Sequence, residues 1–131
     1  MAQQVFRRAL LRTYQSQCAF CGLSFQEALD AAHILPWAMS NQQQRLDPSN
    51  GVLVCATHHR LFDANLITFN SSYKTVYEDP EGINGLYSSS DKAATVAIHE
   101  TLLKLPEDRR FRPNQDLLRR RNIAAKWGEL N

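Results

Sequence analysis

The segment NGVLVCATHHRLFDANLITF, at residues 50–69, decides the fold because its character changes twice within a short span. It opens with an Asn-Gly turn and a run of apolar and β-branched residues at 52–55, which predicts a short strand. Residues 57–64 favour a helix, and residues 66–69 return to β-forming side chains. A strand, a helix and a second strand so close together predict a mixed α+β domain.

The flanking segments predict a hairpin and two helical regions. The hairpin follows because two β-rich runs flank residues 70–72. Residues 3–15 predict an amphipathic N-terminal helix with a basic face. A C-terminal helical part covers about residues 90–128, with one long helix that ends before Pro106 and a second helix after it. Residues 38–50 are mostly polar and predict an exposed loop.

The composition limits the chain to one modest domain. Its 131 residues carry 15 Lys and Arg against 13 Asp and Glu, a formal charge of +2, so net charge alone is only a weak argument for a polyanionic partner. This length predicts a single domain over residues 1–131 that would gain stability from a structural metal. No apolar run is long enough to cross a bilayer, and the first residues lack the layout of a signal peptide. We therefore expect an intracellular, cytoplasmic protein with no membrane partner.

Three cysteines and one histidine indicate a metal site. Cys18 and Cys21 are separated by two residues, and Cys55 and His58 have the same spacing. Zn²⁺ prefers four nitrogen or sulfur ligands in a tetrahedron, and this spacing lets one tight turn aim two side chains at one ion. An odd number of cysteines also disfavours a disulfide framework. Two alternatives stay open: a buried Cys55 beside a coincidental Cys-x-x-Cys, or a redox pair, although a helix rather than a strand precedes the first pair.

Three further polar residues, His33, Asn50 and His59, are candidates for a second site. Neighbouring helical residues point about 100° apart, so a helix that aims His58 at zinc aims His59 elsewhere. One helix would then serve two metals. Taken alone, however, His33 also fits a partly buried histidine, and Asn50, which precedes a glycine, also fits a turn residue.

Three blocks in this order, AHILPW, NGVLVC and HHRLFD, resemble the HNH nucleases of the ββα-metal class. The resemblance spans about residues 18–66 and is particularly clear for the branch found as C-terminal domains of bacterial restriction-type endonucleases. It implies an α+β fold with a ββα-metal nuclease core, a structural zinc, flanking helices and a β-hairpin. It also implies metal-dependent hydrolysis of DNA phosphodiester bonds, with Mg²⁺ or Mn²⁺ as catalytic ion beside the Zn²⁺.

The resemblance gives each motif residue a role. His33 matches the general base that takes a proton from the attacking water, and Asn50 matches the residue that holds the loop and orients this base. His59 matches a ligand of the catalytic divalent ion, which binds a phosphate oxygen and the leaving 3′ oxygen. Asp63 follows His59 by four residues, on the same face of a helix, and is the candidate second ligand because a hard cation prefers oxygen.

The residue before His33 departs from the family pattern. Many HNH enzymes have an acidic residue or a histidine there that binds the catalytic metal, whereas this chain has Ala32. Asp30 lies two residues earlier and would point the same way along an extended segment. The strand-side ligand is therefore either Asp30 or missing, in which case His59, Asp63 and water would hold the ion.

Arginines outside the motif are the candidate nucleic-acid-binding residues, because phosphate contacts position a duplex without reading its sequence. We expect DNA as the partner, most naturally double-stranded, with a homodimer and a linked or separate recognition domain left open. The alternative function is a non-catalytic zinc module that binds nucleic acid, for which Ala32 is the best argument. The candidate arginines are Arg7, Arg8, Arg12, Arg109, Arg110 and Arg112.

Overall fold

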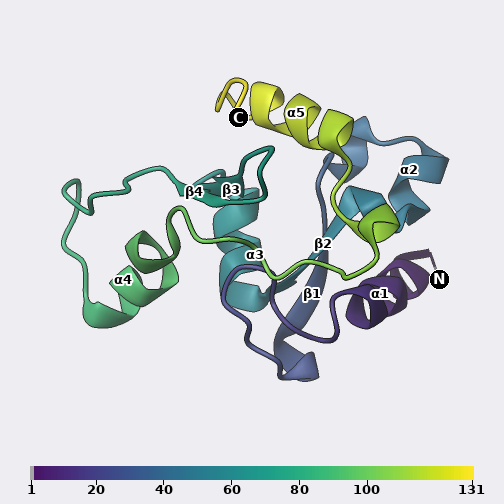
Figure 1. Ribbon diagram of the computed structural model, residues 1–131, viewed down its shortest axis with the longest axis horizontal. Helices are drawn as coiled ribbons and strands as arrows, with labels where there is room; N and C mark the ends of the chain where they lie inside the picture. Colours follow the sequence, from purple (N-terminus) through teal and green to yellow (C-terminus); the bar gives the residue numbers. More distant parts are fainter. Residues whose placement is uncertain (1) are drawn as a thin grey trace.

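The computed structural model describes residues 2–131 and shows helices arranged around two small antiparallel strand pairs (Figure 1). The helices are α1 (Ala2–Thr13), α2 (Gln42–Leu46), α3 (Ala56–Asp63), α4 (Ser89–Ala94) and α5 (Gln115–Ala124). The strands are β1 (Leu29–His33), β2 (Gly51–Cys55), β3 (Ile67–Phe69) and β4 (Thr75–Tyr77). Single 3₁₀ turns occupy Gln26–Ala28, Trp37–Met39, Pro48–Asn50, Val96–Ile98 and Arg109–Phe111. The predicted α+β class is confirmed.

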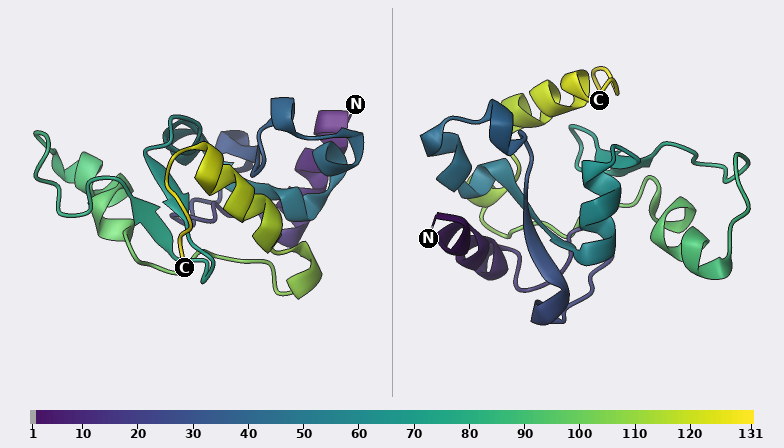
Figure 2. Two further views of the ribbon diagram at one scale, coloured as in Figure 1. Left: turned by 90° about the horizontal axis from the view of Figure 1, so that it is seen from above. Right: turned by 180° about the vertical axis from the view of Figure 1, so that it is seen from behind.

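The centre of the fold is the antiparallel pair β1 and β2. Leu29 lies opposite Cys55 at one end, and His33 lies opposite Gly51 at the other. Both α1 and α3 contact both strands, and the two helices lie on opposite sides of the pair (Figures 1 and 2). Every residue of β2 is buried as a result, which explains its continuous apolar run instead of an alternating pattern. Chain order places the helix α3 directly after β2, so β1, β2 and α3 form a ββα unit.

Gly51 allows α1 to approach the end of β2 closely. A Cβ atom built on Gly51 would lie 2.5 Å from Cζ of Phe6 and 2.7 Å from Cδ1 of Leu10. Phe6 and Leu10 are buried one helical turn apart on α1, whereas Val5 is exposed. The absence of a side chain at Gly51 therefore lets α1 pack closely against the end of the strand pair where His33, the candidate base, lies opposite Gly51.

The predicted hairpin at residues 66–78 is present as β3 and β4, with Ile67 opposite Tyr77 and Phe69 opposite Thr75. Its turn is held by the Asn70 side chain, whose Oδ1 accepts hydrogen bonds from the backbone N–H groups of Ser72 and Lys74. Asparagine is favoured in turns for this reason.

Two sequence predictions about connecting segments are wrong. Residues 38–50 contain α2, which begins with a reciprocal capping box between Asn41 and Gln44 rather than an open loop. The long helix predicted from about residue 90 to Pro106 stops at Ala94. Beyond it, the backbone at residues 100–103 forms hydrogen bonds with the edge of β4, and this pairing replaces helical bonding.

The C-terminal helix α5 lies against the hairpin through polar contacts as well as apolar ones. Leu117 and Leu118 are buried, and Asn122 is buried beside them. Asn122 accepts a hydrogen bond from Oγ1 of Thr68 and donates one to the backbone oxygen of Phe69. Among the described residues, no helix has both the length and the apolar character that a membrane span requires.

Candidate active site and metal centre

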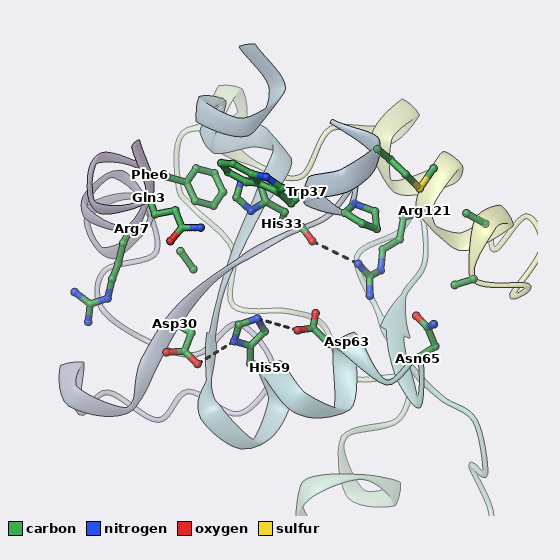
Figure 3. Close-up of a pocket in the computed structure, with 15 residues that line it drawn as sticks. Gln3, Phe6, Arg7, Asp30, His33, Trp37, His59, Asp63, Asn65 and Arg121 are labelled. Carbon is green, nitrogen blue, oxygen red and sulfur yellow. Dashed lines mark hydrogen bonds and ion pairs between the residues drawn. The ribbon is translucent and has the colours of Figure 1, made fainter. Parts of the chain in front are cut away.

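A cavity of about 830 Å³ opens where β1, α1, α3 and α5 meet (Figure 3). Side chains that are far apart in the sequence line it, and their chemistry is that of proton transfer and cation binding. The structure thus gathers four of the predicted site residues around one space, Arg7, His33, His59 and Asp63, and adds two that the sequence left unassigned or secondary. The polar and charged lining residues used below are Asp30, His33, His59, Asp63 and Arg121.

His33, at the end of β1, is held on two faces and at one nitrogen. Its ring stacks on Phe6 with centroids 4.1 Å apart, and Trp37 contacts it edge-on at 5.5 Å. Its Nε2 atom lies 2.9 Å from the backbone oxygen of Arg45. A carbonyl oxygen can only accept, so Nε2 carries the proton and the neutral imidazole has its lone pair on Nδ1. This is the protonation pattern of a ring that accepts a proton at Nδ1.

Asn50 is fully buried behind His33 and organises the loop that follows β1. Its Oδ1 accepts a hydrogen bond from the backbone N–H of Leu35 at 2.9 Å, and its Nδ2 donates to the backbone oxygen of Gln44 at 3.0 Å. Gln44 directly precedes Arg45, whose carbonyl holds His33. Asn50 is therefore bonded to the residue directly before the one whose carbonyl contacts His33.

His59, on α3, lies between two carboxylates (Figure 3). Its Nδ1 atom is 2.9 Å from Oδ2 of Asp30, and its Nε2 atom is 3.3 Å from Oδ2 of Asp63. A proton on Nδ1 that is donated to Asp30 leaves the lone pair of Nε2 facing Asp63. Two acceptor atoms at this separation match adjacent ligands of an octahedral Mg²⁺, which lie about 3 Å apart. The donor set therefore fits a hard divalent cation.

Ala32 does not face this cavity, because its side chain is buried in the hydrophobic core with a relative exposure of 1%. Asp30 lines the cavity instead and supplies the strand-side carboxylate next to His59. The position that departs from the family pattern is thus a core position in this chain, and a carboxylate is still available from the same strand.

The second centre consists of Cys18, Cys21, Cys55 and His58, whose ligand atoms all lie within 4.8 Å of one another. The Sγ atoms of Cys21 and Cys55 are 3.9 Å apart, and Nδ1 of His58 is 3.2 Å from Sγ of Cys55. Sulfur ligands of a tetrahedral Zn²⁺ lie about 3.8 Å apart, so these four residues fit a closed zinc site. The separation of His58 from His59 into two sites follows the prediction for neighbouring helical residues.

The electrostatics of this cluster favour a cation. Hydrogen bonds with Cys21 and Cys55 hold the pKa of the Cys18 thiol far below its usual range. Burial alone would lower the pKa of His58, but hydrogen bonds with Cys18 and Cys55 outweigh it and raise the pKa to about 10. Hydrogen bonds with Cys18 instead raise the pKa of the Cys21 and Cys55 thiols, so negative charge is concentrated on the Cys18 sulfur beside the imidazole. In addition, Nε2 of His58 lies 2.9 Å from the backbone oxygen of Ala94, which leaves Nδ1 as the ligand atom.

The predicted arginines do not form one surface around the cavity. Arg7 lines the cavity, with its Nη2 donating to the backbone oxygen of Gln26. Arg110 forms an ion pair with Asp108 at 2.7 Å, and Arg112 donates from Nε to the backbone oxygen of Pro106. The remaining three are exposed and form no ion pair within the described part of the chain: Arg8, Arg12 and Arg109.

Arg121 is a functional candidate that the sequence interpretation missed. It is 5% exposed, and burial lowers its pKa to about 10 while the Asp63 carboxylate acts in the opposite direction. Its spacing contained the signal: Arg121 follows Leu117 by four residues and Leu118 by three, so it shares their buried face of α5. Within the run of three arginines at 119–121, only this one is buried.

Comparisons with known proteins agree with this geometry. Residues 18–70 match the family described as HNH endonuclease. A solved structure described as the modification dependent TagI restriction endonuclease is similar in fold, with a TM-score of 0.57 and 17% sequence identity; the match covers 89% of this chain and 36% of that one. At this identity the likeness shows the fold alone. No curated protein matches the sequence. The resemblance to HNH nucleases and the fold class are thereby confirmed.

Proposed function

Because residues 18–70 carry the HNH endonuclease motif, we propose that this chain is a metal-dependent DNA endonuclease that hydrolyses phosphodiester bonds. One observation carries the proposal: a histidine with a free Nδ1 and a cation-binding set of a histidine and carboxylates line the same cavity. Water activation and neutralisation of phosphate charge require these two features together.

In this proposal His33 is the general base. The Arg45 carbonyl holds the Nε2 proton, so Nδ1 accepts the proton of the water that attacks phosphorus. Stacking on Phe6 keeps the ring from rotating out of the cavity. Asn50 contributes indirectly, since it holds the loop that provides the Arg45 carbonyl.

His59 and Asp63 would hold the catalytic Mg²⁺ or Mn²⁺, and Asp30 would keep the proton of His59 on Nδ1. When bound, such an ion offsets the negative charge that develops on the phosphate and on the leaving 3′ oxygen. The side chains of Asp30 and Asp63 are 46% and 62% exposed, which leaves room for water and a substrate phosphate.

The four residues Cys18, Cys21, Cys55 and His58 would hold a structural Zn²⁺. Four protein ligands fill the tetrahedron, so no position is left for a substrate. Because Cys55 ends β2 and His58 lies in α3, the metal would tie the strand to the helix that carries His59. The zinc would then support the nuclease site without taking part in the reaction.

We further propose that the substrate is double-stranded DNA and that the chain acts as the nuclease domain of a restriction-type enzyme. The matched structure carries the description of a restriction endonuclease, and this chain corresponds to only about a third of its length. Recognition of a sequence or modified base would then belong to a linked or separate part, and a homodimer would cut both strands.

Plasmid cleavage tests the proposal. The purified protein is incubated with supercoiled plasmid and Mg²⁺, Mn²⁺ or EDTA, beside His33→Ala and the control His99→Ala, whose side chain bonds to the backbone of Tyr77 outside the cavity. Zinc is measured on all three proteins. Cleavage should require the divalent ion, survive in His99→Ala and fall by about 100-fold or more in His33→Ala, with zinc unchanged.

The rival function, a non-catalytic zinc module that binds nucleic acid, predicts the opposite result. It rests on Ala32, which stands at a position where many HNH enzymes have a metal-binding residue. Tight DNA binding and full zinc content without cleavage by any of the three proteins would favour this rival and refute the nuclease.

A further inference from the structure

Arg121 is a buried cation on α5 whose hydrogen bonds all go to backbone carbonyls. Its Nη1 donates to the backbone oxygens of His33 at 3.4 Å and of Ile34 at 2.9 Å. Its Nη2 donates to the backbone oxygen of Phe62 at 2.7 Å, and its Cζ lies 3.5 Å from the centre of the Phe62 ring. The planar guanidinium therefore links the C-terminal end of β1 to the C-terminal end of α3.

The charge of Arg121 has no direct counterion. Within residues 2–131, no carboxylate oxygen comes within 4.0 Å of its guanidinium, and its buried Nε–H has no hydrogen-bond partner. A buried and unpaired cation costs stability that an apolar side chain of the same length would not. Packing of α5 alone therefore does not explain an arginine at position 121, and its hydrogen bonds to the neighbouring elements indicate a role other than stability.

The carbonyls that Arg121 joins belong to the two halves of the proposed active site. His33 is the proposed base, and it lies at the end of β1. Phe62 directly precedes Asp63 at the end of α3, the helix that also carries His59. The Phe62 carbonyl already accepts a hydrogen bond from the backbone N–H of Asn65 at 3.1 Å, so the bond from Arg121 is a second one that ties the end of α3 to another element. Figure 3 shows the guanidinium between the carbonyl of His33 and the α3 end.

We propose that Arg121 is a positioning residue that clamps the strand of the general base to the helix of the catalytic cation, which makes α5 a working part of the nuclease. This inference rests on the proposed function and extends it beyond residues 18–70, since α5 lies outside the matched segment. The forked geometry matters, because Nη1 and Nη2 must bond to different elements at the same time.

The expected effect is on the rate of the chemical step. A base and a cation on separate elements must be held within a fraction of an ångström, and a displacement of about 1 Å costs on the order of 100-fold in rate. Arg121→Lys keeps the charge but has a single ammonium in place of the fork. Arg121→Met keeps the length, removes the buried charge and is expected to fold, because apolar replacements of buried ions are often neutral or stabilising.

Single-turnover cleavage with enzyme in excess over DNA measures this effect. The limiting rate constant should fall about 10-fold to 100-fold in Arg121→Lys and further in Arg121→Met, while the enzyme concentration for half-maximal rate stays within about twofold. The control is Arg120→Lys, an exposed neighbour that pairs with Asp116, and it should match the wild type. A purely structural role would reduce the folded fraction, which raises the half-maximal concentration and leaves the limiting rate unchanged. That result, or a wild-type limiting rate in both Arg121 variants, overturns the clamp.

Amide hydrogen exchange separates the clamp from the nuclease assignment. In Arg121→Lys, backbone amides at 34–35 and 63–65 should exchange at least about 10-fold faster than in the wild type, whether or not the protein cleaves DNA. If the wild type cleaves no DNA, the proposed function fails and the catalytic role of Arg121 fails with it. If the wild type cleaves and exchange at these amides is unchanged in Arg121→Lys, the clamp alone is refuted.

Discussion

The Nε2 atom of His33 lies 2.9 Å from the backbone oxygen of Arg45, and this contact determines which nitrogen of the imidazole is free. The oxygen has no proton to offer, so the ring must donate. The Arg45 carbonyl is held in place in turn, because the backbone oxygen of the preceding residue, Gln44, accepts a hydrogen bond from the buried Asn50. A backbone carbonyl cannot be removed by mutation, which makes it a durable means of setting a tautomer.

We predict that neutral His33 carries its proton on Nε2. Long-range ¹H–¹⁵N correlation spectra of ¹⁵N-histidine-labelled protein distinguish the two tautomers by the ¹⁵N shifts of the ring. The His33→Gln variant identifies the signal, because the resonances of His58, His59 and His99 persist in it. A proton found on Nδ1 would contradict the assignment of His33 as a base through that atom.

Asn50→Ala should destabilise the protein and slow cleavage together. The substitution leaves the buried N–H of Leu35 without its partner and removes one of two hydrogen bonds to the Gln44 carbonyl, which still accepts from the backbone N–H of Asp47, at a cost of about 2 kcal/mol in the free energy of unfolding. Denaturant unfolding of the zinc-loaded protein measures this cost. Asn84→Ala is the control, because Asn84 is exposed and, among the described residues, its side chain bonds only to Asp79. Equal stability of the two variants would mean that Asn50 does not hold the loop.

The Cys₃His cluster could be predicted from the sequence because each pair spans a single turn. Cys18 with Cys21, and Cys55 with His58, need only local backbone geometry to converge, and the strand at 52–55 then needs only its apolar run. The three motif blocks likewise contain His33, Asn50 and His59, to which the proposed roles belong. These features depend on few long-range contacts.

The contacts of Asp30 and Arg121 could not be predicted in the same way. Asp30 meets His59 across 29 residues and Arg121 meets Ile34 across 87, so both depend on how separate elements dock. The helix predicted at 90–106 was wrong for a related reason. Residues with high helix propensity, such as Lys104, lie in an extended segment whose backbone bonds to distant residues, for example Lys104 N–H to the oxygen of Ala19. Local propensity is overruled where tertiary hydrogen bonds compete with it.

Removal of zinc should unfold the centre of the molecule. Structural zinc contributes about 10 to 16 kcal/mol in small domains, which is comparable to or larger than the whole stability of such a domain. A strong chelator at neutral pH should release about one zinc per chain and abolish the cooperative thermal transition seen by circular dichroism, and added Zn²⁺ should restore it. Co²⁺ in place of zinc should give the visible absorption of a tetrahedral thiolate site. A zinc-free protein with an unchanged melting temperature would argue against a structural metal.

Asp63→Asn should impair the catalytic ion more than Asp30→Asn does. The amide at position 63 loses the charge that would bind the ion directly, so the Mg²⁺ concentration for half-maximal cleavage should rise by at least about 10-fold. An amide at position 30 still accepts the hydrogen bond from Nδ1 of His59, so a smaller rise is expected. Titration of cleavage with Mg²⁺ compares the two variants. The reverse order would place the ion between His59 and Asp30.

The exposed arginines of α1 should appear in the salt dependence of DNA binding. Arg8 and Arg12 form no ion pair within the described residues, so both are free to contact phosphate. Each lost phosphate contact lowers the slope of log K against log salt by about 0.9, so the Arg8→Ala, Arg12→Ala double variant should lose about 1.8 in slope on duplex DNA. Arg119→Ala is the matched control, since Arg119 pairs with Asp116 and Glu129. Binding measured by fluorescence anisotropy over a range of salt concentrations, in EDTA to prevent cleavage, gives both slopes. If the double variant and the control have the same slope as the wild type, the duplex does not contact this exposed face of α1, and the remaining candidates for phosphate contacts are Arg7 at the cavity and the arginines that follow residue 108.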